Sequence, residues 1–353
     1  MSGVQMLTVT AEEGEQRLDR WLRRRFPQLG QGSIEKMCRK GELRLDGARA
    51  KASDRVQPGQ VVRVPPLPAA PAPDTRTAEG VTQGIAPDDA AMIQAAVLWK
   101  DAHVIALNKP PGLPSQGGSG LGRRHVDGLT GALTFGFKER PVLVHRLDRD
   151  TSGVMLLART PRVARRLAAA FRDRETRKIY WAAVAGVPSP AMGTIRTGLV
   201  KAGGHGARGE GEKMRCLPLA EVERTPGAKR ATSDYAVLER LGSRAAWVAL
   251  VPVIGRTHQL RAHMAEIGHP IVGDGKYGGS GQENPGTGWG AQLGGEISRK
   301  LHLHARSIRF AHPVTGEAVT VTAPLPAHMA RTFAGFDWQE RAVPADPFAE
   351  DEG

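Results

Sequence analysis

Residues 145–153 read HRLDRDTSG and place one carboxylate, Asp148, between two arginines, Arg146 and Arg149. Nearby cations favour the charged form of a carboxylate, so we expect Asp148 to be ionised at neutral pH. An ionised carboxylate in a fixed position can act as a nucleophile, as a base or as a metal ligand. A structural ion pair in a turn would need the same residues, so the pattern by itself leaves both interpretations open.

Two apolar runs flank this polar stretch and must position it. Residues 142–144 precede it and residues 154–158 follow it, and both runs are bounded by polar residues and glycine. Short apolar runs of this kind are typical of buried strands. The sequence therefore predicts a polar loop between two core strands, where side chains are aimed with little freedom.

The nine residues resemble the catalytic loop of the RluA-type pseudouridine synthases, which isomerise uridine in structured RNA. The resemblance implies that Asp148 is the essential nucleophile and that Arg146 contacts the substrate, as a residue that displaces the target base. It also implies that the target uridine leaves its stack to reach the carboxylate. The isomerisation is redox-neutral and consumes nothing, so we expect no cofactor and no metal.

Two further segments resemble elements of the same family. Residues 109–112 match a Lys-Pro-x-Gly element that lies close to the active site, which makes Lys109 a candidate substrate-binding residue. An ordinary surface lysine is the alternative. Lys178 and Tyr180 match a Lys-x-Tyr strand. The resemblance implies that Tyr180 is catalytic, because the family's tyrosine stacks on the flipped base and is implicated in proton removal.

Residues 255–278 resemble the third signature of the family. We expect a helix with Thr257 as its N-cap, in which an arginine pairs with the catalytic carboxylate. Arg261 is the candidate for this role. Arg256 is the alternative and is better suited to bind a phosphate or anchor a loop. His258 lies three positions before Arg261 and shares a helical face with it, so it is a candidate substrate-binding residue.

The chain of 353 residues carries a net charge of +13 and has a pI near 10.2. A basic balance of this size indicates a nucleic acid or an anionic membrane surface as the partner. No apolar run approaches the roughly 20 residues that span a bilayer, and the N-terminus lacks a signal-like segment. Its two cysteines are isolated and fit a reducing compartment, so we expect a cytoplasmic protein.

Residues 1–66 are predicted to form a small RNA-binding domain. Apolar residues recur at helical spacing from Leu18 to Phe26, a second helix is expected from Ser33 to Gly41, and short strands follow. This order resembles the alpha-L RNA-binding motif of ribosomal proteins and RNA-modifying enzymes. A solvated charged face is the alternative interpretation. The candidate RNA-binding residues are Arg17, Arg20, Arg24, Lys36, Arg39 and Lys40.

The remaining boundaries follow from composition. Residues 67–90 are rich in proline and alanine and are predicted to form a linker. Residues 91–330 form the expected catalytic domain, and residues 331–353 form a tail whose acidic end, after Pro344, is expected to be disordered. Predicted strands occupy residues 97–99, 104–107, 178–184, 233–238 and 245–253, and a predicted helix begins at Thr160 and Pro161.

The resemblance implies an α+β fold, a mixed and largely antiparallel sheet with flanking helices. It implies a monomer that isomerises uridines in large-subunit ribosomal RNA. A non-catalytic RNA-binding assembly factor is the first alternative. A metal-dependent RNA hydrolase that uses Asp148, Asp150 and histidines is the second. Two pairs of histidines, His258 with His263 and His302 with His304, have spacings that a zinc site could use. No cysteine and no His-Glu-x-x-His helix accompanies them, so we predict no metal site.

Overall fold

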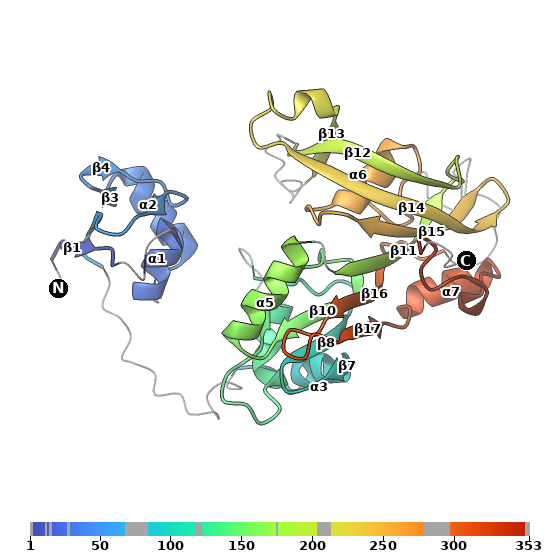
Figure 1. The fold of residues 1–353 in the computed structure, drawn as a ribbon, viewed down its shortest axis with the longest axis horizontal. Helices are drawn as coiled ribbons and strands as arrows, with labels where there is room; N and C mark the ends of the chain where they lie inside the picture. Colours follow the sequence, from blue (N-terminus) through green and yellow to red (C-terminus); the bar gives the residue numbers. More distant parts are fainter. Residues whose placement is uncertain are drawn as a thin grey trace. The chain divides into compact units, whose positions relative to one another are not determined.

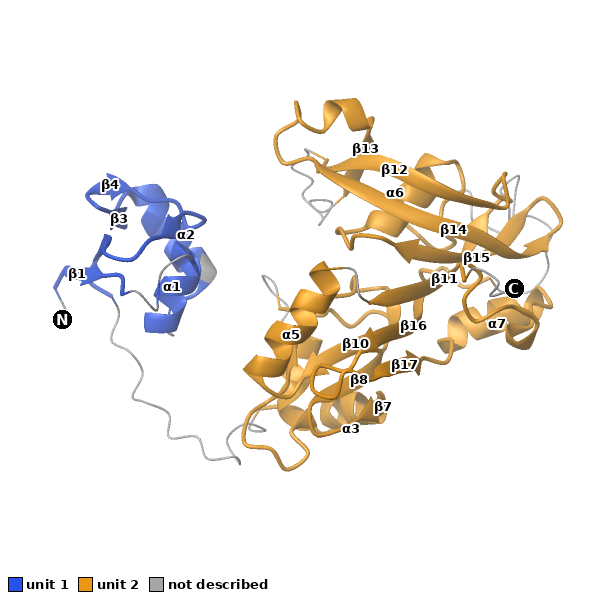
Figure 2. Ribbon diagram, in the orientation of Figure 1, with its two compact units in different colours: residues 1–77 blue, residues 78–353 orange. Residues whose placement is uncertain are grey.

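The computed structural model describes residues 3–10, 13, 16–26, 29–67, 84–117, 122–173, 176–202, 213–278 and 297–349. The chain divides into two compact units, residues 1–77 and residues 78–353 (Figure 2). Residues 68–83, most of the predicted linker, lie outside the described ranges. The two units are therefore treated one at a time.

The first unit contains two helices and two small sheets; strands β3 to β6 follow the helices as predicted, whereas β1 and β2 precede them. Strands β1, β6, β3 and β4 form one sheet, and β2 pairs with β5. Trp21, Leu22 and Ile34 lie in its core. The second helix begins two residues earlier than predicted, at Gln31, and ends at Gly41, whose φ of 70° suits glycine. The elements are β1 (Gln5–Thr8), β2 (Gln16–Arg17), α1 (Leu18–Arg25), α2 (Gln31–Lys40), β3 (Arg44–Leu45), β4 (Ala48–Arg49), β5 (Arg55–Val56) and β6 (Val61–Val64).

The second unit is built on one sheet of eleven strands (Figure 1). Its order is β13-β12-β14-β15-β11-β16-β10-β8-β7, with β17 beside β16 and β9 beside β10. Among the described strands, β10 and β16 are the parallel pair and the other neighbours are antiparallel, which confirms the predicted fold class. The strands are β7 (Val97–Lys100), β8 (Val104–Lys109), β9 (Val142–Leu143), β10 (Ser152–Ala158), β11 (Arg177–Ala185), β12 (Met192–Lys201), β13 (Met214–Leu217), β14 (Lys229–Leu241), β15 (Ala245–Pro252), β16 (Leu303–Ala311) and β17 (Ala318–Thr322).

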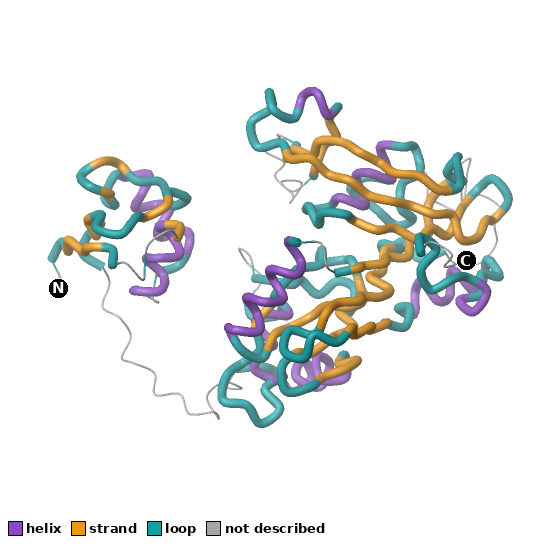
Figure 3. Tube along the Cα trace, viewed as in Figure 1, coloured by secondary structure: helices purple, strands orange, loops and turns teal. Residues whose placement is uncertain are grey.

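Helices cover both faces of this sheet (Figure 3). Because strand side chains alternate between faces, β8 and β10 send one set toward α3 and α4 and the other toward α5. At the other end, β11 and β15 send one set toward α6 and the other toward α7. The helices are α3 (Pro87–Ala95), α4 (Val126–Leu129), α5 (Pro161–Arg172), α6 (Gln259–Glu266) and α7 (Ala327–Gly335), with 3₁₀ turns η2 (Thr130–Leu133), η3 (Leu219–Glu221) and η4 (Glu340–Ala342).

Three predictions about boundaries are wrong. The linker was expected to continue to residue 90, but α3 begins at Pro87, with proline in its first turn and two acidic residues beside it. The N-cap of α6 is His258, not Thr257. The tail is ordered as far as Ala349, since Trp338 is buried and Asp346 accepts two hydrogen bonds from Arg177, each of 3.0 Å.

Candidate active site

The predicted loop lies between two strands, as expected. Strand β9 ends at Leu143, strand β10 begins at Ser152, and the two pair in antiparallel register. Gly153 has a φ of 108°, and a Cβ atom there would clash with the carbonyl of Ala305 on β16. Glycine is therefore needed where the loop enters the parallel pair of strands. This close approach fixes the end of the loop that carries Asp148.

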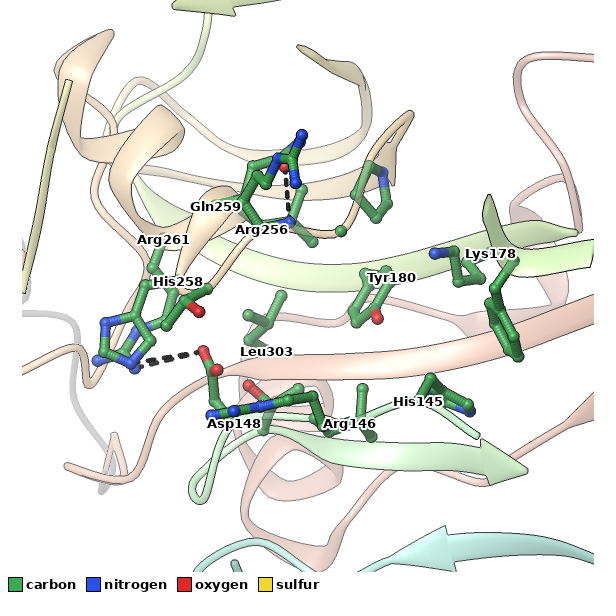
Figure 4. A pocket seen from close by; sticks show the side chains of 17 residues that line it. His145, Arg146, Asp148, Lys178, Tyr180, Arg256, His258, Gln259, Arg261 and Leu303 are labelled. Carbon is green, nitrogen blue, oxygen red and sulfur yellow. Dashed lines mark hydrogen bonds and ion pairs between the residues drawn. The ribbon is translucent and has the colours of Figure 1, made fainter. Parts of the chain in front are cut away.

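Asp148 is half-buried and lines a pocket of about 270 Å³. Its Oδ2 lies 3.6 Å from Nη1 of Arg261 and 3.8 Å from Nε2 of His258. The two arginines beside it in sequence are exposed, and Arg149 donates to the carbonyl of Gly112 instead. The cation nearest to the carboxylate within the described part of the chain therefore comes from a distant helix. The pocket residues, grouped in Figure 4, are His145, Arg146, Leu147, Asp148, Thr151, Phe171, Lys178, Tyr180, Pro252, Gly255, Arg256, Thr257, His258, Gln259, Leu260, Arg261 and Leu303.

Arg261 is buried, and two of its nitrogens are held by a second carboxylate. Its Nε and Nη2 donate to Asp274 at 2.7 and 2.8 Å, which leaves Nη1 directed at Asp148. Burial lowers the pKa of Arg261, but the hydrogen bonds and charge of Asp274, together with Asp148, outweigh it and raise the pKa. The guanidinium is therefore a fixed positive charge beside Asp148. Arg256, the alternative, lines the same pocket, and its backbone N–H donates to Oε1 of Gln259.

Tyr180 lies on β11 where the pairing with β16 shifts register. Its side chain lines the pocket, with Leu303 between it and Asp148 in Figure 4. Burial raises the pKa of the Tyr180 hydroxyl, and the charge of Asp148 raises it further. The ring is therefore an uncharged, protonated phenol at neutral pH, which suits stacking against an uncharged base.

His258 has a φ of 52° and is buried beside Asp148. Its Nδ1 lies 3.1 Å from the hydroxyl of Tyr277, and that oxygen accepts a hydrogen bond of 2.7 Å from the Met214 N–H. The Tyr277 proton is therefore free to be donated to Nδ1. This arrangement favours the tautomer of His258 that carries its proton on Nε2, the nitrogen facing Asp148.

Lys109 does not line the pocket. Its side chain is fully buried, and Nζ donates to the carbonyls of Pro110, Leu113 and Arg149 at 2.9, 2.8 and 2.9 Å. Burial lowers its pKa to about 7, although Asp150 and Asp148 act in the opposite direction. The structure thus places Lys109 beneath the loop, where it ties Arg149 to residues 110–113, and not where the predicted substrate contact would need it.

The far side of the pocket holds residues to which the sequence gave no role. The ring of Phe171 lies 4.5 Å from that of His145 and 5.3 Å from Nζ of Lys178. Nε2 of His145 accepts a hydrogen bond of 2.8 Å from the Leu156 N–H. Burial and the charge of Lys178 lower the pKa of His145 to about 3, so its ring is neutral. Asp274 and Tyr277 were also missed, although both stand in the resembling stretch 255–278.

The histidines considered for zinc are engaged elsewhere. His302 contacts Thr332 and His304 contacts Ser152, at 2.9 and 2.8 Å, and burial lowers the pKa of both to about 4. Within the described ranges, no group of three or more His, Cys, Asp or Glu side chains is arranged to hold a metal ion.

The predicted RNA-binding residues of the first unit are all exposed. Arg17 forms an ion pair of 2.8 Å with Asp19, and Lys40 forms one of 3.7 Å with Glu42. In the second unit Arg146 is exposed at the pocket. None of the helices in the described ranges is long and apolar enough to cross a membrane.

Comparison with known proteins gives a consistent result. Residues 103–266 match the family described as RNA pseudouridylate synthase. The ribosomal large subunit pseudouridine synthase C of Vibrio cholerae is 32% identical over 327 residues, 92% of this chain and 95% of that protein. The Escherichia coli K12 protein of the same name is 33% identical, over 93% of this chain and 95% of its own. The solved structure of a human protein named "RNA Pseudouridylate Synthase Domain Containing 4" matches this chain with a TM-score of 0.56 and 28% sequence identity. The match covers 70% of this chain and 95% of the human chain. This chain therefore belongs to the RNA pseudouridylate synthase family.

Proposed function

We propose that this enzyme isomerises uridine to pseudouridine in large-subunit ribosomal RNA, with Asp148 as the nucleophile. The observation that carries the proposal is the Asp148 carboxylate in a pocket that Tyr180 also lines, 3.6 Å from the buried guanidinium of Arg261. The names of the bacterial relatives supply the class of RNA. These comparisons do not favour the alternative of a non-catalytic assembly factor.

The reaction would proceed on a uridine that has left its stack. Unstacking costs a few kcal/mol, and pocket contacts offset this cost. Asp148 then adds to the nucleotide, at C1′ or at C6 of the base, and the C1′–N1 bond breaks. The uracil turns and its C5 forms the new bond to C1′, while the C5 proton leaves and N1 gains a proton. Asp148 is released unchanged, so atoms and electrons balance without a cofactor.

Each side chain has a separate task in this scheme. Arg261 holds the Asp148 carboxylate in position through their ion pair, directed at the base. Tyr180 stacks on the uracil, and its protonated hydroxyl would donate its proton to N1 of the detached base before the phenolate accepts the C5 proton. Arg146, exposed at the pocket, fills the space that the flipped base leaves, and Arg256 binds a neighbouring phosphate. His258 contributes an N–H donor near the carboxylate and the substrate.

The first unit would increase affinity for long RNA. We propose that residues 1–66 form an RNA-binding domain and that its exposed residues Arg20, Arg24, Lys36 and Arg39 contact phosphates. The segment that ends before α3 would join it to the catalytic domain, which begins at Pro87 and includes the C-terminal segment that packs on the sheet through Trp338. We further propose that the protein acts as a cytoplasmic monomer and that it uses no metal.

The deciding experiment maps pseudouridine in ribosomal RNA from cells with and without this gene product. We expect one or a few large-subunit uridines to lose the modification, and to regain it when the wild-type chain is restored. A small set of sites is expected because the pocket admits one base at a time. If the two maps are identical, ribosomal RNA is not the substrate, and the same comparison on total RNA then tests the reaction itself.

A further inference from the structure

Two aromatic side chains outside the pocket are exposed next to cations. Phe135 is 37% exposed and Phe137 is 41% exposed, in a segment that leads into β9. The guanidinium of Arg159 lies 4.3 Å from the ring centre of Phe137, and Nζ of Lys100 lies 5.0 Å from that of Phe135. Phe135 also has a φ of 46°, a left-handed conformation that costs a bulky residue energy. The chain therefore exposes the Phe135 ring at a conformational cost.

Arg159 holds Phe137 in place. It is only 4% exposed, and its Nη1 donates to the carbonyl of Thr134 at 3.2 Å. A buried cation thus covers one side of the ring, while much of the ring stays accessible. An accessible aromatic ring beside positive charge is the combination by which proteins stack unpaired bases.

Helix α5 connects this position with the pocket. Arg159 stands two residues before its first residue, and Phe171, in its last turn, lines the pocket. Twelve residues of α-helix span about 18 Å. Val163 and Leu167 form the buried face, in the same cluster as Val142 of β9.

The outward face of α5 carries basic residues in its first half and at its end. Arg162, Arg165 and Arg172 are exposed, and their spacing places them on the side opposite Val163 and Leu167. A solvated helix face could carry these charges for solubility alone. It would not require exposed phenylalanines, one of them in a strained conformation, at the end of the same row.

We propose that Phe137, Arg162, Arg165 and Arg172, here called the α5 track, bind the single-stranded RNA that flanks the target uridine. The proposal rests on the proposed function and adds the path that the RNA follows away from the pocket. The three guanidinium groups pair with successive phosphates, and the Phe137 ring stacks on an unpaired base beyond them. The surface fits RNA because its charge complements phosphate and its aromatic end complements a base.

The test compares two triple variants of the full-length protein with equal loss of charge. The first is Arg162→Gln, Arg165→Gln and Arg172→Gln. The control is Arg240→Gln, Arg331→Gln and Arg341→Gln, three exposed arginines on β14, α7 and η4. Binding of a ribosomal RNA fragment with single-stranded flanks is measured at several salt concentrations. Three lost contacts at about 0.7 each should make the slope of log K against log salt shallower by about 2, and the control should keep the wild-type slope.

The aromatic end has its own variants. Phe137→Ala should lower affinity for the same RNA by about tenfold, and Phe137→Tyr should restore it, because a flat ring is enough for stacking. In Phe137→Trp, bound RNA should quench the indole fluorescence. At saturating RNA, kcat should stay at the wild-type value in every variant, because none of these residues lines the pocket.

The proposal is overturned if the triple variant of the α5 track has the affinity and salt slope of the control, or if Phe137→Ala binds RNA as tightly as the wild type. The proposed function is judged separately, by pseudouridine formation in the wild-type protein. A wild type that binds RNA but leaves every uridine unchanged would overturn the function, and the slope comparison would still decide the track.

Discussion

Arg261 is bound more tightly to Asp274 than to Asp148. Two hydrogen bonds of 2.7 and 2.8 Å join it to Asp274, whereas Asp148 lies 3.6 Å from the remaining nitrogen. Asp274 is buried and its Oδ1 also accepts from the backbone N–H groups of Lys276 and Tyr277, at 3.0 and 3.2 Å. The position of the guanidinium is therefore set from behind, before any substrate enters the pocket.

Asp274→Asn tests this positioning role. An amide can accept one of the two hydrogen bonds but turns an N–H donor toward the other guanidinium nitrogen, so Arg261 should shift. We expect kcat to fall by about 100-fold with little change in KM, because small displacements cost that much. The melting temperature should also fall, since one charge of a buried pair is lost. If the variant keeps the wild-type kcat at a temperature where it is still folded, Asp274 contributes to stability only and does not position Arg261.

Asp148→Asn keeps the shape of the side chain and removes its charge. Pseudouridine formation should become undetectable because the nucleophile is lost, and RNA affinity should change less than tenfold because the other contacts to the RNA remain. Asp150→Asn is the matched control, since Asp150 is exposed in the same loop and does not line the pocket. Tritium release from RNA labelled at C5 of its uridines measures the turnover of both variants. Appreciable turnover by Asp148→Asn would remove it from the nucleophile's role.

Tyr277→Phe tests the tautomer of His258. Without the hydroxyl, Nδ1 loses its donor and the proton on Nε2 is no longer favoured. Turnover should fall roughly fivefold to tenfold, the range of one lost hydrogen bond. The loss should disappear in a His258→Gln background, because a side-chain amide has no tautomer to fix. Independent effects of the two substitutions on kcat would contradict the coupling.

Stability should decrease as the pH is lowered from about 6.5. Burial lowers the pKa of His145 to about 3 and that of His304 to about 4, so the folded state holds fewer protons than the unfolded chain between those values and 6.5. The folded state therefore loses stability throughout this interval. Urea unfolding of His304→Gln at several pH values should give a lower free energy of unfolding at pH 7 and a shallower dependence on pH. Parallel curves for the variant and wild type would contradict this assignment.

Removing residues 1–66 separates the two units. The second unit has its own cores, so it should stay folded and still isomerise a short RNA at high concentration. Binding of long ribosomal RNA should weaken, with a salt slope shallower by at least one or two contacts, about 0.7 to 0.9 each. An unchanged slope would show that these residues do not bind RNA. Normal binding without turnover would make the first unit part of the active site.

The sequence predicted those elements that a local pattern of apolar or capping residues identifies. The apolar runs at 97–99, 104–107 and 154–158 became β7, β8 and β10, and Thr160 caps α5 through a hydrogen bond from the Val163 N–H. Strand β12 was not predicted, because its exposed residues alternate with few apolar ones and its pairing partner lies further along the chain. Helix α3 was concealed by the alanine and proline that precede it.

The site was predictable as a set of residues and much less so as a geometry. Asp148, Tyr180 and Arg261 line one pocket, as the resemblance implied. The local pattern around Asp148 points to Arg146 and Arg149 as its cations, whereas the family resemblance points to Arg261, and it is Arg261 that the fold brings near. Lys109 is predicted to bind the substrate because residues 109–112 resemble the family's Lys-Pro-x-Gly element. Its burial depends on three carbonyls whose positions no local pattern specifies.

The parallel pairing of β10 with β16 has a consequence for how the enzyme is made. Ser152, at the end of the catalytic loop, is in register with His304, and the two side chains are joined by a hydrogen bond of 2.8 Å. Contacts between residues so distant in sequence form late, because a long segment of chain must close first. A ribosome translating this protein must therefore pass residue 304 before the loop can be anchored. While the chain is still being synthesised, it carries Asp148 without the strand that fixes it, so the catalytic loop is among the last parts of the fold to be secured.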